Sequence, residues 1–145
     1  FRRIIVPTDF SEAGWKALPY AASFAREFGA GVRLLHVIEP AAYYDLEGDR
    51  SAAAEAQLKK AMAVKLNLLR QSCGIEATVQ VRRGVAFQEI IHEAADQNAD
   101  LIIISTHGRT GLKHVMLGST AESVVRHATC PVLVVREHEH EFVAL

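Results

Sequence analysis

The chain has 145 residues, of which 50% are hydrophobic and 23% are charged, with a formal net charge of −1 at pH 7. This length suits one domain built around one hydrophobic core, and the composition is typical of a globular protein. The 16 lysines and arginines against 17 aspartates and glutamates give no basic excess for binding DNA or RNA. No apolar run approaches the roughly 18 residues that a membrane-spanning helix needs. Nucleic-acid-binding and membrane-spanning classes are therefore set aside, and residues 1–145 are expected to form a single domain.

The first third of the chain predicts a buried strand followed by a helix. Residues 3–7 are apolar without alternation, which indicates a strand buried on both faces. Asp9 and Ser11 are candidate N-caps of the next helix, with Glu12 placed three residues after Asp9 as in a capping box. Pro19 is expected to kink that helix or to shift its start. The side chains expected on its buried face are Trp15, Leu18, Ala22, Ala25 and Phe28.

The rest of the chain continues to alternate between strands and helices. After a strand at 32–38, the alanine-, leucine- and lysine-rich segment 51–72 predicts the longest helix. Residues 77–82 alternate and indicate a half-exposed edge strand. The remaining expected elements are a helix at 85–97 with Phe87, Ile90, Ile91 and Ala94 inward, a central strand at 100–104, a helix at 119–127, a strand at 132–135 and a loose tail at 137–145.

This pattern predicts an α/β fold: an open, five-stranded parallel sheet with four helices over its two faces. Right-handed crossovers, an alternating third strand and a uniformly apolar fourth strand favour the order 3-2-1-4-5. In such a sheet the winding reverses between the first and fourth strands, and ligands bind at their carboxyl ends. Pro7, Thr8 and Asp9 follow one of these strands, and a glycine-containing loop from Ser105 follows the other.

The loop Ser105-Thr106-His107-Gly108-Arg109-Thr110-Gly111, continuing to Leu117-Gly118-Ser119-Thr120, is the most informative segment. Its glycines allow positive φ and a close approach of backbone to a ligand. Gly118-Ser119-Thr120 is expected to open a helix, whose free N–H groups and dipole suit a phosphate. The alternative is that the glycines only shape a turn and Ser119 only caps the helix.

The loop resembles the nucleotide-binding signature of the universal stress protein family: a glycine, two residues, a glycine, nine residues, then Gly-Ser or Gly-Thr. Gly108, the nine residues 109–117 and Gly118-Ser119 match it, while Ser105 stands where the pattern has its first glycine. The opening Ile-Val-Pro-Thr-Asp-Phe-Ser, the Leu-Leu-His-Val-Ile and Ala-Asp-Leu-Ile strands and the closing Cys-Pro-Val-Leu-Val-Val extend the resemblance over nearly the whole chain. It implies the universal stress protein fold, which is like that of the adenine nucleotide alpha hydrolases, and a cytoplasmic homodimer in a family with ATP-binding and non-binding branches.

The resemblance also implies roles for individual residues. The residues that it would place around ATP are Pro7, Thr8, Asp9, Val37, Ile104, Ser105, His107, Gly108, Arg109, Gly118, Ser119 and Thr120. Val37 would touch the adenine, and Asp9 would lie near the phosphates and their Mg²⁺ or Mn²⁺ ion. The residues alone leave alternatives open, because Asp9 could cap a helix, and Val37 and Ile104 could simply pack in the core.

Other function classes lack their motifs. The chain has no GxxxxGK[ST], no GxGxxG after the first strand, no GxSxG elbow and no receiver-type acidic cluster. His138-Glu139-His140 could bind a metal only weakly, since no third ligand is fixed nearby. Cys73 and Cys130 form no CxxC pair, and in a chain without a secretion signal they are expected to be reduced thiols of a cytoplasmic protein.

Three hypotheses follow. The leading one is an ATP-binding regulatory module of the stress response that acts as a dimer and is not an enzyme. A slow ATPase would use His107 or Asp9 to position water, with a divalent cation aiding the leaving group. A dimerisation module that binds no nucleotide is the third, with Ser105 marking a lapsed site. In each case the apolar edge strand 132–135 is expected to pair two copies of the chain.

Overall fold

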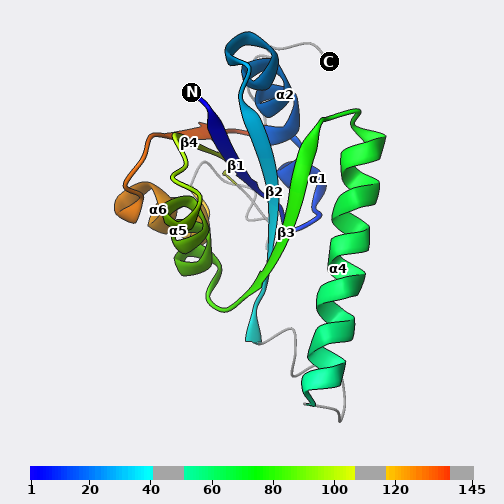
Figure 1. The fold of residues 1–145 in the computed structure, drawn as a ribbon. Helices are drawn as coiled ribbons and strands as arrows, with labels where there is room; N and C mark the ends of the chain where they lie inside the picture. The colour runs from blue at the N-terminus through cyan, green and yellow to red at the C-terminus, as the bar shows by residue number, and fades with distance from the viewer. Residues whose placement is uncertain (41–50, 107–116, 138–145) are drawn as a thin grey trace.

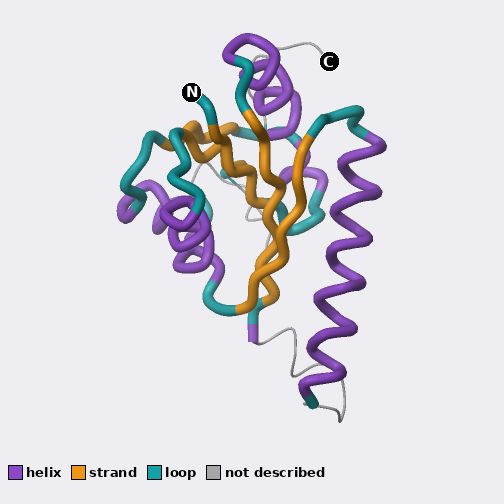
Figure 2. Tube along the Cα trace, in the orientation of Figure 1, coloured by secondary structure: helices purple, strands orange, loops and turns teal. Residues whose placement is uncertain are grey.

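The computed structural model describes residues 1–40, 51–106 and 117–137 (Figures 1 and 2). Five parallel strands form one sheet in the order β3-β2-β1-β4-β5, which confirms the predicted fold class and topology. The strands are β1 (Arg3–Pro7), β2 (Gly31–Ile38), β3 (Ala77–Arg83), β4 (Leu101–Ser105) and β5 (Val132–Val135). The described helices are α1 (Glu12–Trp15), α2 (Ala17–Phe28), α4 (Ala52–Ser72), α5 (Ala86–Asp96) and α6 (Ser119–His127).

The helices cover both faces of the sheet, so the core has two layers (Figure 1). On one face α2 and α4 pack through residues such as Leu18 and Leu66. On the other face α5 and α6 pack through residues such as Ile90 and Val124. β4 is buried at all five residues because it has strands on both sides and helices on both faces. β4 is thus internal as expected, although β1 is the middle strand.

The predicted first helix is divided at Lys16, and two of its expected core positions are wrong. Pro19 becomes the third residue of α2, in the first turn, where a missing N–H costs no intrahelical bond. The break separates Trp15 from the packed face of α2, and Trp15 is 46% exposed, while Phe28 is the last residue of α2 and is 48% exposed. Phe28 contacts the rings of Phe1 and Phe24 at the rim of the sheet.

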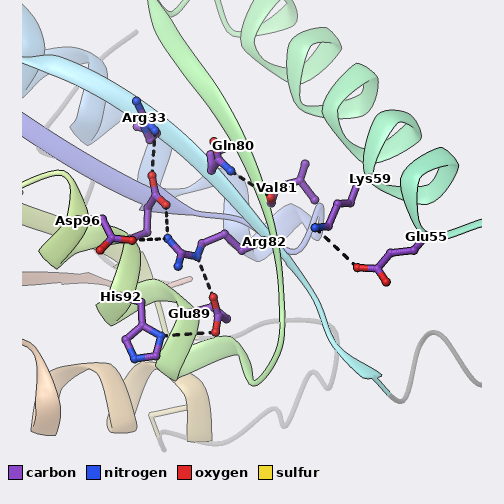
Figure 3. Close-up of polar contacts among 10 residues, drawn as sticks. Arg33, Glu55, Lys59, Gln80, Val81, Arg82, Glu89, His92 and Asp96 are labelled. Carbon is purple, nitrogen blue, oxygen red and sulfur yellow. Dashed lines mark hydrogen bonds and ion pairs between the residues drawn. The ribbon is translucent and has the colours of Figure 1, made fainter. Parts of the chain in front are cut away.

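A buried carboxylate in α5 is a further feature that hydrophobic periodicity did not reveal. Glu93 is 2% exposed and accepts hydrogen bonds from Arg33 of β2 at 2.9 Å and Arg82 of β3 at 2.7 Å. Arg82 also bonds Glu89 and Asp96 (Figure 3). Burial lowers the pKa of Arg82, but the hydrogen bonds to Glu93, Glu89 and Asp96 outweigh it and raise that pKa. The network ties α5 to the outer half of the sheet.

Cys73 and Cys130 are free, partly buried thiols, as predicted. No helix in the described ranges combines the length and apolarity needed to cross a membrane. The predicted tail lies outside the described residues from position 138 onward.

Candidate functional site

The carboxyl ends of β1 and β4 lie at the same edge of the sheet, because the two strands are adjacent and parallel. Pro7 is the last residue of β1 and Ser105 is the last residue of β4. β1 is paired with β2 on its other side, so the winding of the chain reverses at this point. Polar segments after both strands therefore meet where open α/β sheets bind ligands.

Thr8 is buried, and its N–H, its carbonyl oxygen and its hydroxyl oxygen each have a hydrogen-bond partner. Its N–H donates to the carbonyl of Leu35 at 2.8 Å, which extends the ladder between β1 and β2 by one residue. Its carbonyl oxygen lies 2.8 Å from Nδ1 of His36, and its hydroxyl oxygen accepts the N–H of Phe10 at 3.1 Å. Thr8 thus anchors the turn that leaves β1.

Asp9 organises this turn rather than capping the helix. Its Oδ1 accepts both the N–H of Ser11 at 2.9 Å and the Ser11 hydroxyl at 2.5 Å. Ser11 is the N-cap of α1, since its hydroxyl oxygen accepts the N–H of Gly14 at 3.1 Å. The predicted capping box between Asp9 and Glu12 is therefore wrong, because the helix begins two residues later than that arrangement requires.

Gly14 is a site residue that the sequence reasoning missed. A Cβ at this position would lie 3.1 Å from Oδ1 of Asp9 and 3.4 Å from the hydroxyl oxygens of both Ser11 and Thr8. Because Gly14 has no side chain, the three side-chain oxygens of Thr8, Asp9 and Ser11 can lie close to its backbone. A glycine among helix-forming residues just after Asp-Phe-Ser was the available signal.

Gly118 joins the start of α6 to the end of β4. Its N–H donates to the carbonyl of Thr106 at 2.8 Å, and a Cβ on Gly118 would lie only 2.7 Å from the same oxygen. Its φ of −59° is ordinary, so close approach explains the glycine and the expectation of positive φ does not apply to this position. The Gly118 N–H is also engaged rather than free for an anion.

Ser119 and Thr120 are the first two residues of α6, and Gly118 is its N-cap. The alternative in which Ser119 caps the helix is therefore wrong. Because the first N–H groups of a helix have no intrahelical acceptor, the residues after Gly118 present donors at the N-terminal end of α6. That end carries the positive side of the helix dipole.

Three further predicted residues, Val37, Ile104 and Ser105, are partly or fully buried. Val37 is partly buried against the α5 and α6 layer, and Ile104 is 5% exposed within it. Ser105 is 8% exposed and is in register with Val135 of β5. The core-packing alternative for Ile104 is thus sufficient to explain that residue. His107, Gly108 and Arg109 lie outside the described residues, as does the His138 to His140 segment.

Within residues 1–40, 51–106 and 117–137, no three His, Cys, Asp or Glu side chains cluster as a metal site. Among the described residues, Asp9 would therefore offer its carboxylate to a divalent cation without a cluster of further His, Cys, Asp or Glu ligands around it. This arrangement fits Mg²⁺, which keeps several waters and commonly binds through one or two carboxylates and the phosphates of its ligand.

The fold and the site together define an open α/β domain with polar residues after the two strands where the winding of its sheet reverses. The family model for the universal stress protein family matches residues 1–136. Universal stress protein MJ0531 of Methanocaldococcus jannaschii is 32% identical, with 97% of this chain and 85% of that protein covered. The chain therefore belongs to the universal stress protein family.

Solved structures agree with this assignment. The structure of MJ0577, a universal stress protein of the same organism, is 30% identical with a TM-score of 0.81, covering 97% of this chain and 99% of that one. The universal stress protein of Archaeoglobus fulgidus in complex with dAMP has a TM-score of 0.65 at 21% identity, with 92% and 97% covered. The likeness to the latter is one of fold.

Proposed function

We propose that this chain is a nucleotide-binding regulatory module of the stress response that binds ATP with Mg²⁺ or Mn²⁺ at the carboxyl ends of β1 and β4. The observation that carries the proposal is the meeting of two polar segments at the winding reversal. One is the turn built on Thr8 and Asp9, and the other is the Thr106–Gly118 junction that starts α6. The dAMP complex of the A. fulgidus relative supports an adenine nucleotide as the ligand class.

In this proposal the two segments bind different parts of the ligand. The N-terminal end of α6, with Ser119 and Thr120, takes the phosphates, because helix N-termini favour anions. Asp9 binds the divalent cation that the phosphates of ATP coordinate. Val37, which is partly buried, and Ser105, which is buried, lie on the strands to either side of β1 and offer the apolar and ribose contacts that the family resemblance implies.

We infer a regulatory rather than a catalytic role. Oδ1 of Asp9 already accepts two hydrogen bonds from Ser11, so this oxygen is not placed to take a proton from an attacking water. A slow ATPase remains the enzymatic alternative. Single-turnover measurements with the magnesium complex of ATP distinguish the two, since phosphate release would need to outpace spontaneous hydrolysis.

The proposal includes a homodimer formed through β5. The carbonyls of Pro131 and Val135 accept hydrogen bonds at 3.0 Å and 2.9 Å from the N–H groups of Ile102 in β4 and of Thr106, the residue after β4. Alternate residues of a strand bond to opposite sides, so Val132 and Val134 direct their N–H and C=O groups to the outer edge. In the described part of the chain β4 is the one strand paired with β5. An unprotected apolar edge of this kind favours pairing with a second copy.

One observation favours a second candidate, a dimerisation module that binds no nucleotide. The close approach of Gly118 to the Thr106 carbonyl explains this glycine without any ligand. Ser105 also departs from the nucleotide-binding signature. Both points weaken the glycine loop as a sign of phosphate binding, although they leave the placement of Asp9 unexplained.

Thermal unfolding in increasing concentrations of ATP with Mg²⁺ tests the proposal. A ligand that binds only the folded state must raise the melting temperature progressively with its concentration. Mg²⁺ alone and GTP with Mg²⁺ serve as controls for the cation and for the base. A constant melting temperature at millimolar ATP, together with no heat on titration, would favour the second candidate.

A further inference from the structure

His36 of β2 packs against the turn that follows β1, and it is 9% exposed. Its Nδ1 is 2.8 Å from the carbonyl oxygen of Thr8, so Nδ1 carries a proton and donates it, because a carbonyl only accepts. The preceding residue, Leu35, accepts the Thr8 N–H at 2.8 Å. Two consecutive residues of β2 thus hold both backbone groups of Thr8.

The two hydrogen bonds between β2 and the Thr8 backbone also determine the orientation of Asp9. The Thr8 carbonyl and the Asp9 N–H belong to one trans, planar peptide group, in which they point in opposite directions. The His36 ring packs with Phe10 in the layer that contains α2 and α4. Because the carbonyl points to this ring, the Asp9 N–H is turned away from it, and Asp9 leaves the strand in a single orientation.

The next residue is strained and is held by the same histidine. Phe10 has a φ of +65°, a left-handed conformation that is unusual for a residue with a bulky side chain. The Phe10 ring packs against that of His36 in a tilted arrangement with centroids 4.6 Å apart, and Nζ of Lys65 from α4 lies 4.6 Å from the centroid of the Phe10 ring. Strained residues persist where their surroundings over-determine them, and they concentrate at functional sites.

We propose that His36 is a positioning residue for the ligand site. By donating to Thr8 and packing against Phe10, it holds the turn in the one conformation that directs Asp9 to the proposed ligand site at the carboxyl ends of β1 and β4. The imidazole lies behind the turn and acts through the backbone, without touching the ligand. The inference rests on the proposed function for its effect on binding, whereas its effect on the turn can be measured without any ligand.

Three substitutions at His36 separate the effect of its Nδ1–H donor from the effect of the volume of its ring. His36→Asn places an amide N–H at the position of Nδ1 and preserves the bond to Thr8. His36→Gln moves its amide one bond further along the side chain, to the position of Nε2, and His36→Leu has the shape of asparagine without a donor. His92→Asn, at a histidine side chain that is 61% exposed on α5, is the matched control.

The dissociation constant of ATP with Mg²⁺ is measured by titration calorimetry well below each variant's unfolding midpoint. We expect His36→Asn and His92→Asn to bind within about threefold of the parent chain, and His36→Gln and His36→Leu to bind about tenfold more weakly. A purely structural histidine would lower the melting temperature in all three His36 variants and leave the affinity of the folded protein unchanged. Equal affinities for the Asn and Gln variants would overturn the inference.

Amide hydrogen exchange gives a second readout that requires no nucleotide. We expect the Ser11 and Gly14 amides, which bond inside the turn, to exchange at least about tenfold faster in His36→Gln than in His36→Asn. Equal protection in both variants would overturn the inference even if binding were altered. If the parent chain binds no ATP but the difference in exchange is found, the proposed function fails and the positioning role of His36 in the turn stands.

Discussion

The N–H of Gly118 donates to the carbonyl oxygen of Thr106 at 2.8 Å, and a Cβ on Gly118 would lie 2.7 Å from that same oxygen. The end of β4 and the start of α6 are therefore in direct backbone contact. This contact closes the loop between positions 106 and 118 at its base. It also brings the N-terminal end of α6 to the carboxyl end of β4, where the proposed nucleotide phosphates would lie.

Gly118→Ala is expected to weaken binding of ATP with Mg²⁺ at least about tenfold and to lower the free energy of unfolding by about 1–3 kcal/mol. The added Cβ must push α6 away from a backbone oxygen, which has little freedom to move. Titration calorimetry and urea unfolding measure the two effects. Gly31→Ala is the control, because its Cβ would meet its nearest atom at an ordinary 3.8 Å. Normal binding by the Gly118 variant would place the phosphates elsewhere.

Ser105→Gly is expected to change the dissociation constant of ATP by less than about tenfold, or 1.4 kcal/mol. Serine crowds the end of β4 relative to glycine, but its hydroxyl can add a hydrogen bond worth about 0.5–1.5 kcal/mol. These opposing effects nearly cancel. Calorimetric titration of both proteins checks this, and a gain of a hundredfold or more would mean that Ser105 blocks the site, favouring the module without nucleotide.

Val134→Pro is expected to convert the proposed dimer into a monomer of 15.9 kDa in light scattering at micromolar concentration. Proline removes an N–H that faces the outer edge of β5 and leaves the bonds between β5 and β4 in place. Val134→Thr keeps both the shape and the N–H, and we expect it to remain dimeric. A parent chain that is itself monomeric under these conditions would rule out the β5 interface.

Glu93→Gln is expected to lower the free energy of unfolding by about 1–3 kcal/mol, measured by urea unfolding. Arg33 and Arg82 would lose a charged partner, but their side chains are 27% and 23% exposed, so water moderates the loss. Glu122→Gln breaks an ion pair with Arg126 whose side chains are 49% and 70% exposed, and it should cost less than about 0.5 kcal/mol. Equal effects would show that the Glu93 network adds nothing to stability.

Asp100 is expected to make folding stability depend on pH in the acid range. Hydrogen bonds from the N–H groups of Arg2 and Arg3 lower the pKa of this carboxyl in the folded chain. Because the folded pKa is the lower one, the stabilisation is present above the unfolded value and disappears as the pH falls through the folded value. The parent chain should therefore exceed Asp100→Asn in stability at pH 7, and the two should converge in acid. A difference that does not change between pH 7 and pH 2 would contradict this.

The spacing of apolar residues and the residues that cap or interrupt helices and strands determined most of the fold. The bounds expected for β1, α6 and β5 agree with the structure, and β2, β3 and α4 differ by one residue at an end. These elements are specified by local signals, such as Ser51 capping α4 and the apolar run of β1. The strand order could also be inferred, because burial on both faces is visible as an unbroken apolar run.

Tertiary contacts decided what local patterns could not express. The break at Lys16 separates Trp15 from the packed face of α2, and Phe28 is the last residue of that helix, so both are exposed against expectation. Glu93 of α5 is buried against Arg33 of β2 and Arg82 of β3, which are 60 and 11 residues away in the sequence. The same holds at the site, where His36 reaches Thr8 across 28 residues. The sequence by itself determined which strand ends carry polar groups, whereas their orientation depended on these contacts between distant residues, which chain order does not encode.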